Sequence, residues 1–148
     1  MNNERFEIGS KKLAEVDGQV GEDVVAPLGD LGKYIVEFAF GDIYSRDGLS
    51  LRDREIATIA MLSSRSGVEP QLKVHIKAGL NVGLTCEEIE EIIIQTVPYS
   101  GFPTAINALN VLKSLWIVCK DNKKWISWKC LNLKTGFIKH KVITGIFL

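Results

Sequence analysis

The spacing of apolar and polar positions predicts helices along most of the chain, with a helical hairpin at its centre. Apolar residues recur at helical intervals after position 50, at Leu51, Ile56, Ile59, Ala60 and Leu62. Ser50 followed by Asp53 resembles a capping box, in which the hydroxyl accepts a hydrogen bond from a free amide of the first turn. Gly67 suits the end of this helix, Pro70 the first turn of a second helix, and Gly83 the end of that second helix.

Similar patterns predict further helices on both sides of the hairpin. Before it we expect a short amphipathic helix, a connection, an apolar helix and a loop, at Arg5–Asp17, Pro27–Gly32, Tyr34–Gly41 and Asp42–Leu49. After it, Thr85 and Glu88 form a second capping box for a helix that Pro98 stops. Pro103 then begins a last helix. The isoleucine-rich run after Glu88 also has some strand propensity, but the capping box and the three-four spacing favour a helix. The predicted fold class is all-α.

The charge distribution divides the chain into two parts. The sequence has 18 basic and 18 acidic residues, so its formal net charge is zero. Up to Trp116 there are 11 basic and 17 acidic residues, whereas from Ile117 onward 7 lysines face Asp121 alone. We therefore expect a helical domain over residues 1–116 and an atypical basic tail over residues 117–148. The tail fits a small hairpin, a disordered segment or the product of a shifted reading frame.

Composition points to a cytoplasmic protein without a metal. The three cysteines, Cys86, Cys119 and Cys130, are odd in number and form no CxxC pair, which argues against a disulfide framework. The N-terminus is polar, and no apolar run reaches the roughly 18 residues needed to cross a bilayer. His75 and His140 are far apart, and no paired ligand spacing suggests zinc. With no overall basic excess we expect no nucleic acid as a partner, and without a long apolar run we expect no membrane, although the basic run with Trp125 and Trp128 leaves an anionic partner of the tail open.

His75 is the first candidate for chemistry because it is the only histidine in the predicted helical domain. Histidine titrates near neutrality and so suits proton transfer, and Glu55 on the preceding helix can hold the imidazole in one tautomer. Gly79 lies four residues after His75 on the same face and is expected to leave open volume there for a small substrate. From the residues alone two other readings stay open: a structural histidine, and a solvated Glu55 or its ion pair with Arg52 or Arg54.

Three strings resemble a known family: FGDIYSRDGLSLRDREIATIAML from Phe40, LKVHIKAGLNVGLTCEEIEEIIIQ from Leu72 and GFPTAINALNVLK from Gly101. Their order and spacing are similar to those of the carboxymuconolactone decarboxylase family, over about Phe6–Trp116. The resemblance implies an alkylhydroperoxidase-like helical bundle around a central hairpin, assembled into trimers or hexamers with sites near subunit contacts. The likeness ends where the lysine-rich tail begins, which favours a shifted reading frame as the origin of the tail.

The family that the chain resembles has two chemical branches, which differ in their cysteines. Redox members similar to alkylhydroperoxidases have a CxxC whose second cysteine lies four residues before the histidine, so that a base is near the thiolate. The corresponding positions here are Val68 and Gln71, so peroxide reduction through this motif is excluded. The resemblance then implies the decarboxylase branch, which uses no cofactor.

Decarboxylation of 4-carboxymuconolactone explains which side chains such a site needs. The departing carboxylate is on a ring carbon conjugated to the lactone carbonyl, so loss of carbon dioxide leaves a dienolate. The protein must supply a proton, stabilise the oxyanion and bind the remaining carboxylate. The resemblance implies His75 as general acid with Glu55 beside it. Arg46 and Arg54 are candidates for binding the carboxylate in two hydrogen bonds, and Phe102 is a candidate apolar wall.

We therefore expect a cofactor-independent lyase for 4-carboxymuconolactone or a related small carboxylated lactone, with a place in the catabolism of aromatic compounds. Two alternatives stay open. One is an oxidoreductase of the same superfamily that works through Cys86, which follows Thr85 at a predicted helix start. The other is a non-catalytic oligomer that binds small ligands and kept only the fold.

Overall fold

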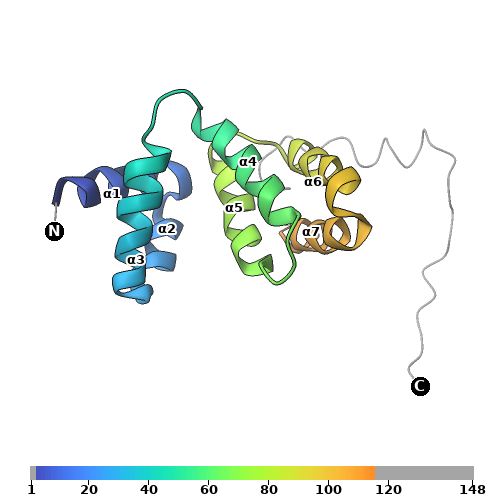
Figure 1. Ribbon diagram of the computed structural model, residues 1–148, viewed down its shortest axis with the longest axis horizontal. Coiled ribbons are helices and arrows are strands. Elements are labelled where there is room, and N and C mark those ends of the chain that lie inside the picture. Colours follow the sequence, from blue (N-terminus) through green and yellow to red (C-terminus); the bar gives the residue numbers. More distant parts are fainter. Residues whose placement is uncertain (1–2, 116–148) are drawn as a thin grey trace, which may run out of the picture.

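The computed structural model describes residues 3–115, so the predicted basic tail lies outside the described residues. The described part is helical without a strand, which confirms the all-α class (Figure 1). Its elements are α1 (Asn3–Asp17), α2 (Gln19–Val25), the 3-10 helix η1 (Ala26–Leu28), α3 (Asp30–Tyr34), the π-helix η2 (Ile35–Tyr44), α4 (Leu51–Ser63), α5 (Glu69–Asn81), α6 (Cys86–Ser100) and α7 (Phe102–Ser114). Within residues 3–115 no helix has both the length and the apolar character needed to span a membrane.

The predicted central hairpin is formed by α4 and α5. The Ser50 hydroxyl accepts a hydrogen bond from the Asp53 amide at 3.1 Å and so caps α4. Pro70 lies in the first turn of α5, where its missing N–H has no helical partner to lose. Gly83 directly follows the C-cap of α5 with a φ angle of 98°, which side chains with a Cβ rarely adopt. The predicted end of α4 at Gly67 is wrong, because this helix stops at Ser63 and Gly67 lies in the connection after it. Local sequence therefore sets the start of both helices and the end of α5.

The predicted capping box of α6 is confirmed, but the predicted end of this helix is wrong. Thr85 Oγ1 accepts from the Glu88 amide at 3.1 Å, and the Glu88 carboxylate accepts from the Thr85 amide at 2.9 Å. Pro98 does not stop the helix, which continues to Ser100 and ends at Gly101 with φ 80°. Pro98 is exposed and close to the C-terminal end, so its missing donor removes a single hydrogen bond there.

The segment before the hairpin differs most from the prediction. The connection expected around Pro27 is itself helical, since α2, η1 and α3 follow one another with a break at Gly29. The apolar helix is not closed by Gly41, because η2 continues to Tyr44 and shortens the expected loop. In a π-helix the amides bond to carbonyls five residues earlier rather than four, and this register is not recognisable from apolar spacing.

Gly41 is needed for packing and not for ending a helix. A Cβ at Gly41 would lie 2.7 Å from the carbonyl oxygen of Arg5, and one at Gly9 would lie 2.1 Å from that of Val36. Both distances are shorter than non-bonded atoms tolerate, so only glycine lets α1 and η2 approach backbone to backbone. This contact places the end of η2, with Tyr44, close to the centre of the fold.

Two apolar clusters form the core, and α5 belongs to both. The larger cluster lies among α4–α7, with fully buried Ile59, Ile76, Ile89 and Ile93. The smaller cluster joins α1 and η2 through Leu13, Val16, Val36 and Phe40, to which α5 adds Ala78. Figure 1 shows the two groups of helices side by side, with α5 next to the N-terminal group. His75 lies three residues before Ala78 on α5, at the boundary between the clusters.

Candidate active site

Glu55 and His75, the two residues predicted for chemistry, form a hydrogen bond across the hairpin. Glu55 Oε2 lies 3.0 Å from His75 Nδ1. The Glu55 side chain is completely buried, whereas the His75 side chain is 24% exposed. The helical hairpin therefore holds a buried carboxylate against an imidazole that solvent or a substrate can reach.

The second oxygen of Glu55 binds Tyr44, so the carboxylate has a donor on each side. The Tyr44 hydroxyl donates to Glu55 Oε1 at 2.8 Å. A buried carboxylate without such donors would be strongly destabilising. Because an ionised carboxylate only accepts hydrogen bonds, it keeps a proton on Nδ1 of His75. Nε2 of His75 has no hydrogen-bond partner among residues 3–115 and is the ring nitrogen left for a substrate.

Sequence reasoning missed Tyr44 and Thr58, which extend this chain of hydrogen bonds. Thr58 Oγ1 lies 3.0 Å from Tyr44 Oη and 2.9 Å from the carbonyl oxygen of Arg54, and it can donate its single proton to either one. Burial raises the pKa of the Tyr44 phenol further above its ordinary value, so Tyr44 remains a neutral donor. Thr58 follows Glu55 by three residues on α4, a spacing that could have revealed it. Tyr44 gave no such signal, because the helix before it was expected to end at Gly41.

Asp17 is a second acidic residue near the Glu55–His75 pair, which we call the dyad, and sequence reasoning also missed it. It ends α1, where a carboxylate opposes the helix dipole. Asn81 of α5 donates through Nδ2 to the carbonyls of Val16 at 2.8 Å and Glu15 at 3.2 Å, which ties this end of α1 to the helix of His75. Burial raises the pKa of Asp17 to about 6; the charge of His75 lowers it, and that of Glu55 raises it. The sequence did offer one signal for Asp17, because an acidic residue at the C-terminal end of a helix is unfavourable and therefore unusual.

Asp17→Asn is expected to stabilise the protein at pH 7 by about 1–2 kcal/mol, because it removes a carboxylate whose charge is partly desolvated. This gain is smaller than the free energy that corresponds to the full pKa shift, since the carboxyl is partly exposed. The pKa of Asp17 is about 6 in the folded chain and has an ordinary value of 3.8. The folded state therefore binds the proton more tightly, and the Asp17 contribution to stability falls as pH rises from about 4 to 6. Urea unfolding at pH 7 should show the gain, and at about pH 4 it should vanish.

Asp23→Asn on α2 is the matched control for this measurement, because Asp23 is exposed. It should change the free energy of unfolding by less than about 0.5 kcal/mol at either pH. A gain in Asp17→Asn that is equal at both pH values would contradict the assignment of the raised pKa to this carboxyl.

The two candidate arginines occupy different environments. Arg54 Nη2 donates to the backbone carbonyl of Arg46 at 2.7 Å, and its guanidinium carbon lies 5.9 Å from the centre of the Tyr44 ring. Its Nε is buried without a hydrogen-bond partner in the described part of the chain. Arg46 is exposed, and its side-chain role stays a prediction. Arg52 pairs with Glu88 and not with Glu55.

The open volume expected beside His75 at Gly79 is not there. A Cβ at Gly79 would lie 2.9 Å from Leu84 Cδ1 and 3.0 Å from Ile59 Cδ1, so the glycine faces the larger core cluster. Gly79 thus lets core side chains approach α5 and loses its physical basis as a substrate-binding residue. Phe102, at the start of α7, is 70% exposed, and its role as an apolar wall stays a prediction.

The arrangement suits proton transfer. Among residues 3–115, no three His, Cys, Asp or Glu side chains are grouped as metal ligands. The dyad instead offers an imidazole with one nitrogen bound by a buried carboxylate and the other without a partner among the described residues. The guanidinium of Arg54 lies near Tyr44, the residue that donates to this carboxylate. The dyad can donate a proton from Nε2 and recover it from solvent.

Comparisons with known proteins give the relatives of this chain. The family described as "Carboxymuconolactone decarboxylase family" matches residues 29–114. The 4-carboxymuconolactone decarboxylase of Acinetobacter baylyi is 33% identical over 87 residues, which cover 59% of this chain and 64% of that protein. An uncharacterized 15.0 kDa protein of Paracoccus denitrificans is 31% identical over 83 residues, 55% of this chain and 62% of that protein.

A third relative is also named as a decarboxylase. The nitrosuccinic acid decarboxylase of Metarhizium robertsii is 30% identical over 77 residues, 52% of this chain and 53% of that enzyme. The chain therefore spans between about half and two thirds of the length of these curated relatives. Glu55 and His75 lie within the family match, whereas Asp17 precedes it. Since the match covers more than half of its residues, the chain belongs to the carboxymuconolactone decarboxylase family.

Proposed function

We propose that this protein is a cofactor-independent decarboxylase-like lyase for a small carboxylated lactone, with 4-carboxymuconolactone as the first candidate. The observation that carries the proposal is the hydrogen-bonded chain from Tyr44 through Glu55 to His75, which leaves His75 Nε2 free. Two of the relatives above are named as decarboxylases, which supports the reaction class.

In the proposed reaction His75 is the general acid. The bond between the ring carbon and the departing carboxylate breaks, and its electron pair moves into the lactone carbonyl as a dienolate. Protonated His75 then gives its Nε2 proton to the dienolate carbon, while Nδ1 keeps its proton through the bond to Glu55. Glu55 stabilises the imidazolium before transfer, and solvent returns the proton afterwards.

Arg54 is the proposed anchor for the carboxylate that remains on the substrate. Its guanidinium lies against the Tyr44 ring and has a buried Nε without a partner among the described residues. A substrate carboxylate would accept a charge-assisted hydrogen bond from this guanidinium, and contact with the buried Nε requires the Arg54 side chain to move outward. Arg46 is the second candidate, since its side chain is exposed and its own backbone carbonyl accepts a hydrogen bond from Arg54.

A homo-oligomer, trimer or hexamer, is part of the proposal. Six large apolar side chains are at least 60% exposed, namely Leu31, Tyr34, Phe38, Met61, Tyr99 and Phe102. So many exposed apolar side chains are unusual in a monomer and favour burial against other copies. Light scattering of the purified chain measures the mass of the assembly. In such an oligomer, Phe102 of a neighbouring subunit would form the apolar wall of the site.

The proposal predicts that the purified full chain releases one carbon dioxide for each 4-carboxymuconolactone consumed, followed in a coupled assay with product identification. Nitrosuccinate is the second substrate to test, because a nitro group also accepts the electron pair left by decarboxylation and one relative bears that name. If the folded protein binds either compound but forms no product, the non-catalytic binding alternative replaces the enzyme proposal. The oxidoreductase alternative gains no support, since Cys86 is only 6% exposed within the core.

A further inference from the structure

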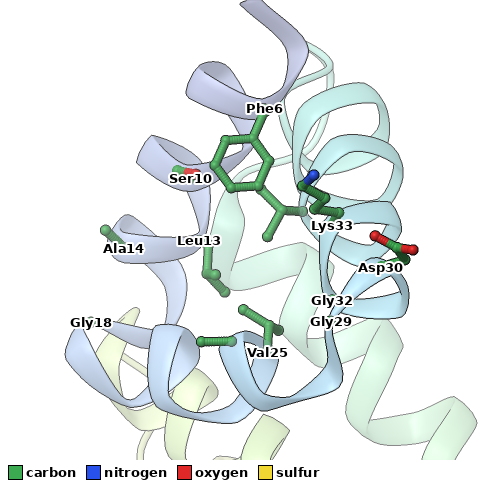
Figure 2. A pocket seen from close by; sticks show the side chains of 12 residues that line it. Phe6, Ser10, Leu13, Ala14, Gly18, Val25, Gly29, Asp30, Gly32 and Lys33 are labelled. Carbon is green, nitrogen blue, oxygen red and sulfur yellow. The ribbon is translucent and has the colours of Figure 1, made fainter. Parts of the chain in front are cut away.

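A cavity in the N-terminal part of the fold lies apart from the dyad. It has a volume of about 590 Å³ and lies between α1 and the segment formed by α2, η1 and α3 (Figure 2). Neither Glu55 nor His75 lines it. Ligand pockets in proteins typically have volumes of about 300–1,000 Å³, so this cavity is large enough for a small organic molecule.

Glycine keeps part of the cavity open. Gly18 and Gly29 both line it, and a Cβ at either position would meet no atom within 4 Å. Both have positive φ angles, of 60° and 58°, so other residues are disfavoured there. The wall at these two points is bare backbone beside unfilled space, which a ligand can occupy without displacing a side chain.

The wall of the cavity is apolar with a cation at one end. Phe6, Leu13, Val25 and Val36 supply apolar side chains from α1, α2 and η2. Figure 2 shows the Lys33 amine next to Phe6, at the opposite end from Leu13 and Val25. Asp30, which also lines the cavity, points to the far side of α3 in the same view.

Two polar side chains that line the cavity have no partner in the described part of the chain. Neither the Lys33 ammonium nor the Ser10 hydroxyl forms a hydrogen bond or ion pair with another residue of 3–115. An unpaired ammonium can bind a monoanion such as a carboxylate in a charge-assisted hydrogen bond. The adjoining rings and branched side chains suit an apolar body.

We propose that this cavity is a second binding site, for a small amphipathic monocarboxylate with an apolar body of one or two rings. The ring body contacts Phe6, Leu13 and Val36, and the carboxylate pairs with Lys33. The site is separate from the dyad, so it exists whether or not His75 is a catalytic residue.

Calorimetric titration of the full chain with 2-naphthoate tests the site, because this probe combines two rings with one carboxylate. We expect one 2-naphthoate bound per chain, and about tenfold weaker binding of the neutral 2-naphthamide, the loss of one charge-assisted hydrogen bond. Lys33→Met keeps the aliphatic stem but removes the charge, and should weaken 2-naphthoate binding by about tenfold. Lys11→Met is the matched control, since Lys11 is exposed on α1 and does not line the cavity.

Two further variants test whether 2-naphthoate binds in this cavity or at His75. Ala14→Trp fills the cavity from an exposed position on α1 and should abolish binding, while His75→Gln should leave it unchanged. No binding by folded wild type, unchanged binding in Ala14→Trp, or loss of binding in His75→Gln would each overturn the proposal. If Ala14→Trp alters the circular dichroism spectrum, the test rests on the two lysine variants. Equal affinities of Lys33→Met and Lys11→Met for 2-naphthoate would then overturn the proposed site. None of these readouts depends on decarboxylation.

Discussion

Replacing His75 with glutamine is expected to lower kcat/KM for decarboxylation by roughly 100- to 10,000-fold, the usual contribution of a general acid. Glutamine fills a similar volume but has no proton to give at neutral pH. The His75 side chain is 24% exposed and only its Nδ1 is bound, so the loss of packing is small. Steady-state kinetics measures the effect, with circular dichroism to show that the helices are retained.

Lys73→Gln is the matched control for His75→Gln, since Lys73 lies two residues earlier on α5 and is exposed. It should leave kcat/KM within about twofold of wild type. If His75→Gln kept turnover near the wild-type rate, the acid would have to be another group. Asp17 would be the first to test, because its pKa of about 6 leaves part of it protonated near neutral pH.

Replacing Glu55 with alanine is expected to cost about 3–5 kcal/mol of unfolding free energy, the range for removing one partner of a buried ionic pair. The variant leaves Tyr44 Oη and His75 Nδ1 without their acceptor and opens a void at a completely buried position. Urea unfolding measures the loss. Glu55→Gln keeps the volume and an acceptor for Tyr44, so it should lose clearly less stability.

Glu91→Ala controls for removing a glutamate from a helix, because Glu91 is exposed on α6. It should cost less than about 0.5 kcal/mol. Equal stability of Glu55→Ala and Glu91→Ala would mean that the buried carboxylate contributes nothing to the fold. The role of Glu55 in decarboxylation is tested separately with Glu55→Gln. This variant is expected to stay folded, so a lower turnover would report the loss of the charge that stabilises protonated His75.

Local chemistry in the sequence was enough to place the central hairpin and α6. Ser50 and Thr85 cap their helices through atoms three residues away, and Gly83 directly follows the C-cap of α5 with a positive φ angle. Such signals act within one turn and hold whatever the helix packs against. Pro98 shows their limit: a proline near an exposed helix end costs one hydrogen bond, and the packed helix continues past it.

Glycine was the residue type most often misinterpreted, because its purpose depends on neighbours that are distant in sequence. Gly41 looked like a helix end, but it lets the Arg5 backbone approach η2. Gly79 looked like open volume beside His75, but Leu84 and Ile59 fill that space. Sequence shows that a side chain is missing there; only packing decides whether a ligand, a backbone or a core side chain takes its place.

The sequence by itself determined the all-α class, the capped hairpin, the family and the candidacy of His75 and Glu55, because these depend on local hydrogen bonding and on matched strings. Only the tertiary structure decided that Tyr44 bonds to Glu55, that Asp17 lies within the electrostatic influence of the dyad, and that a cavity opens beside Lys33. The groups of the site come from α1, η2, α4 and α5, and their bonds span 11 and 20 residues of sequence. Such contacts depend on how the helices pack, and spacing within a single helix cannot determine them.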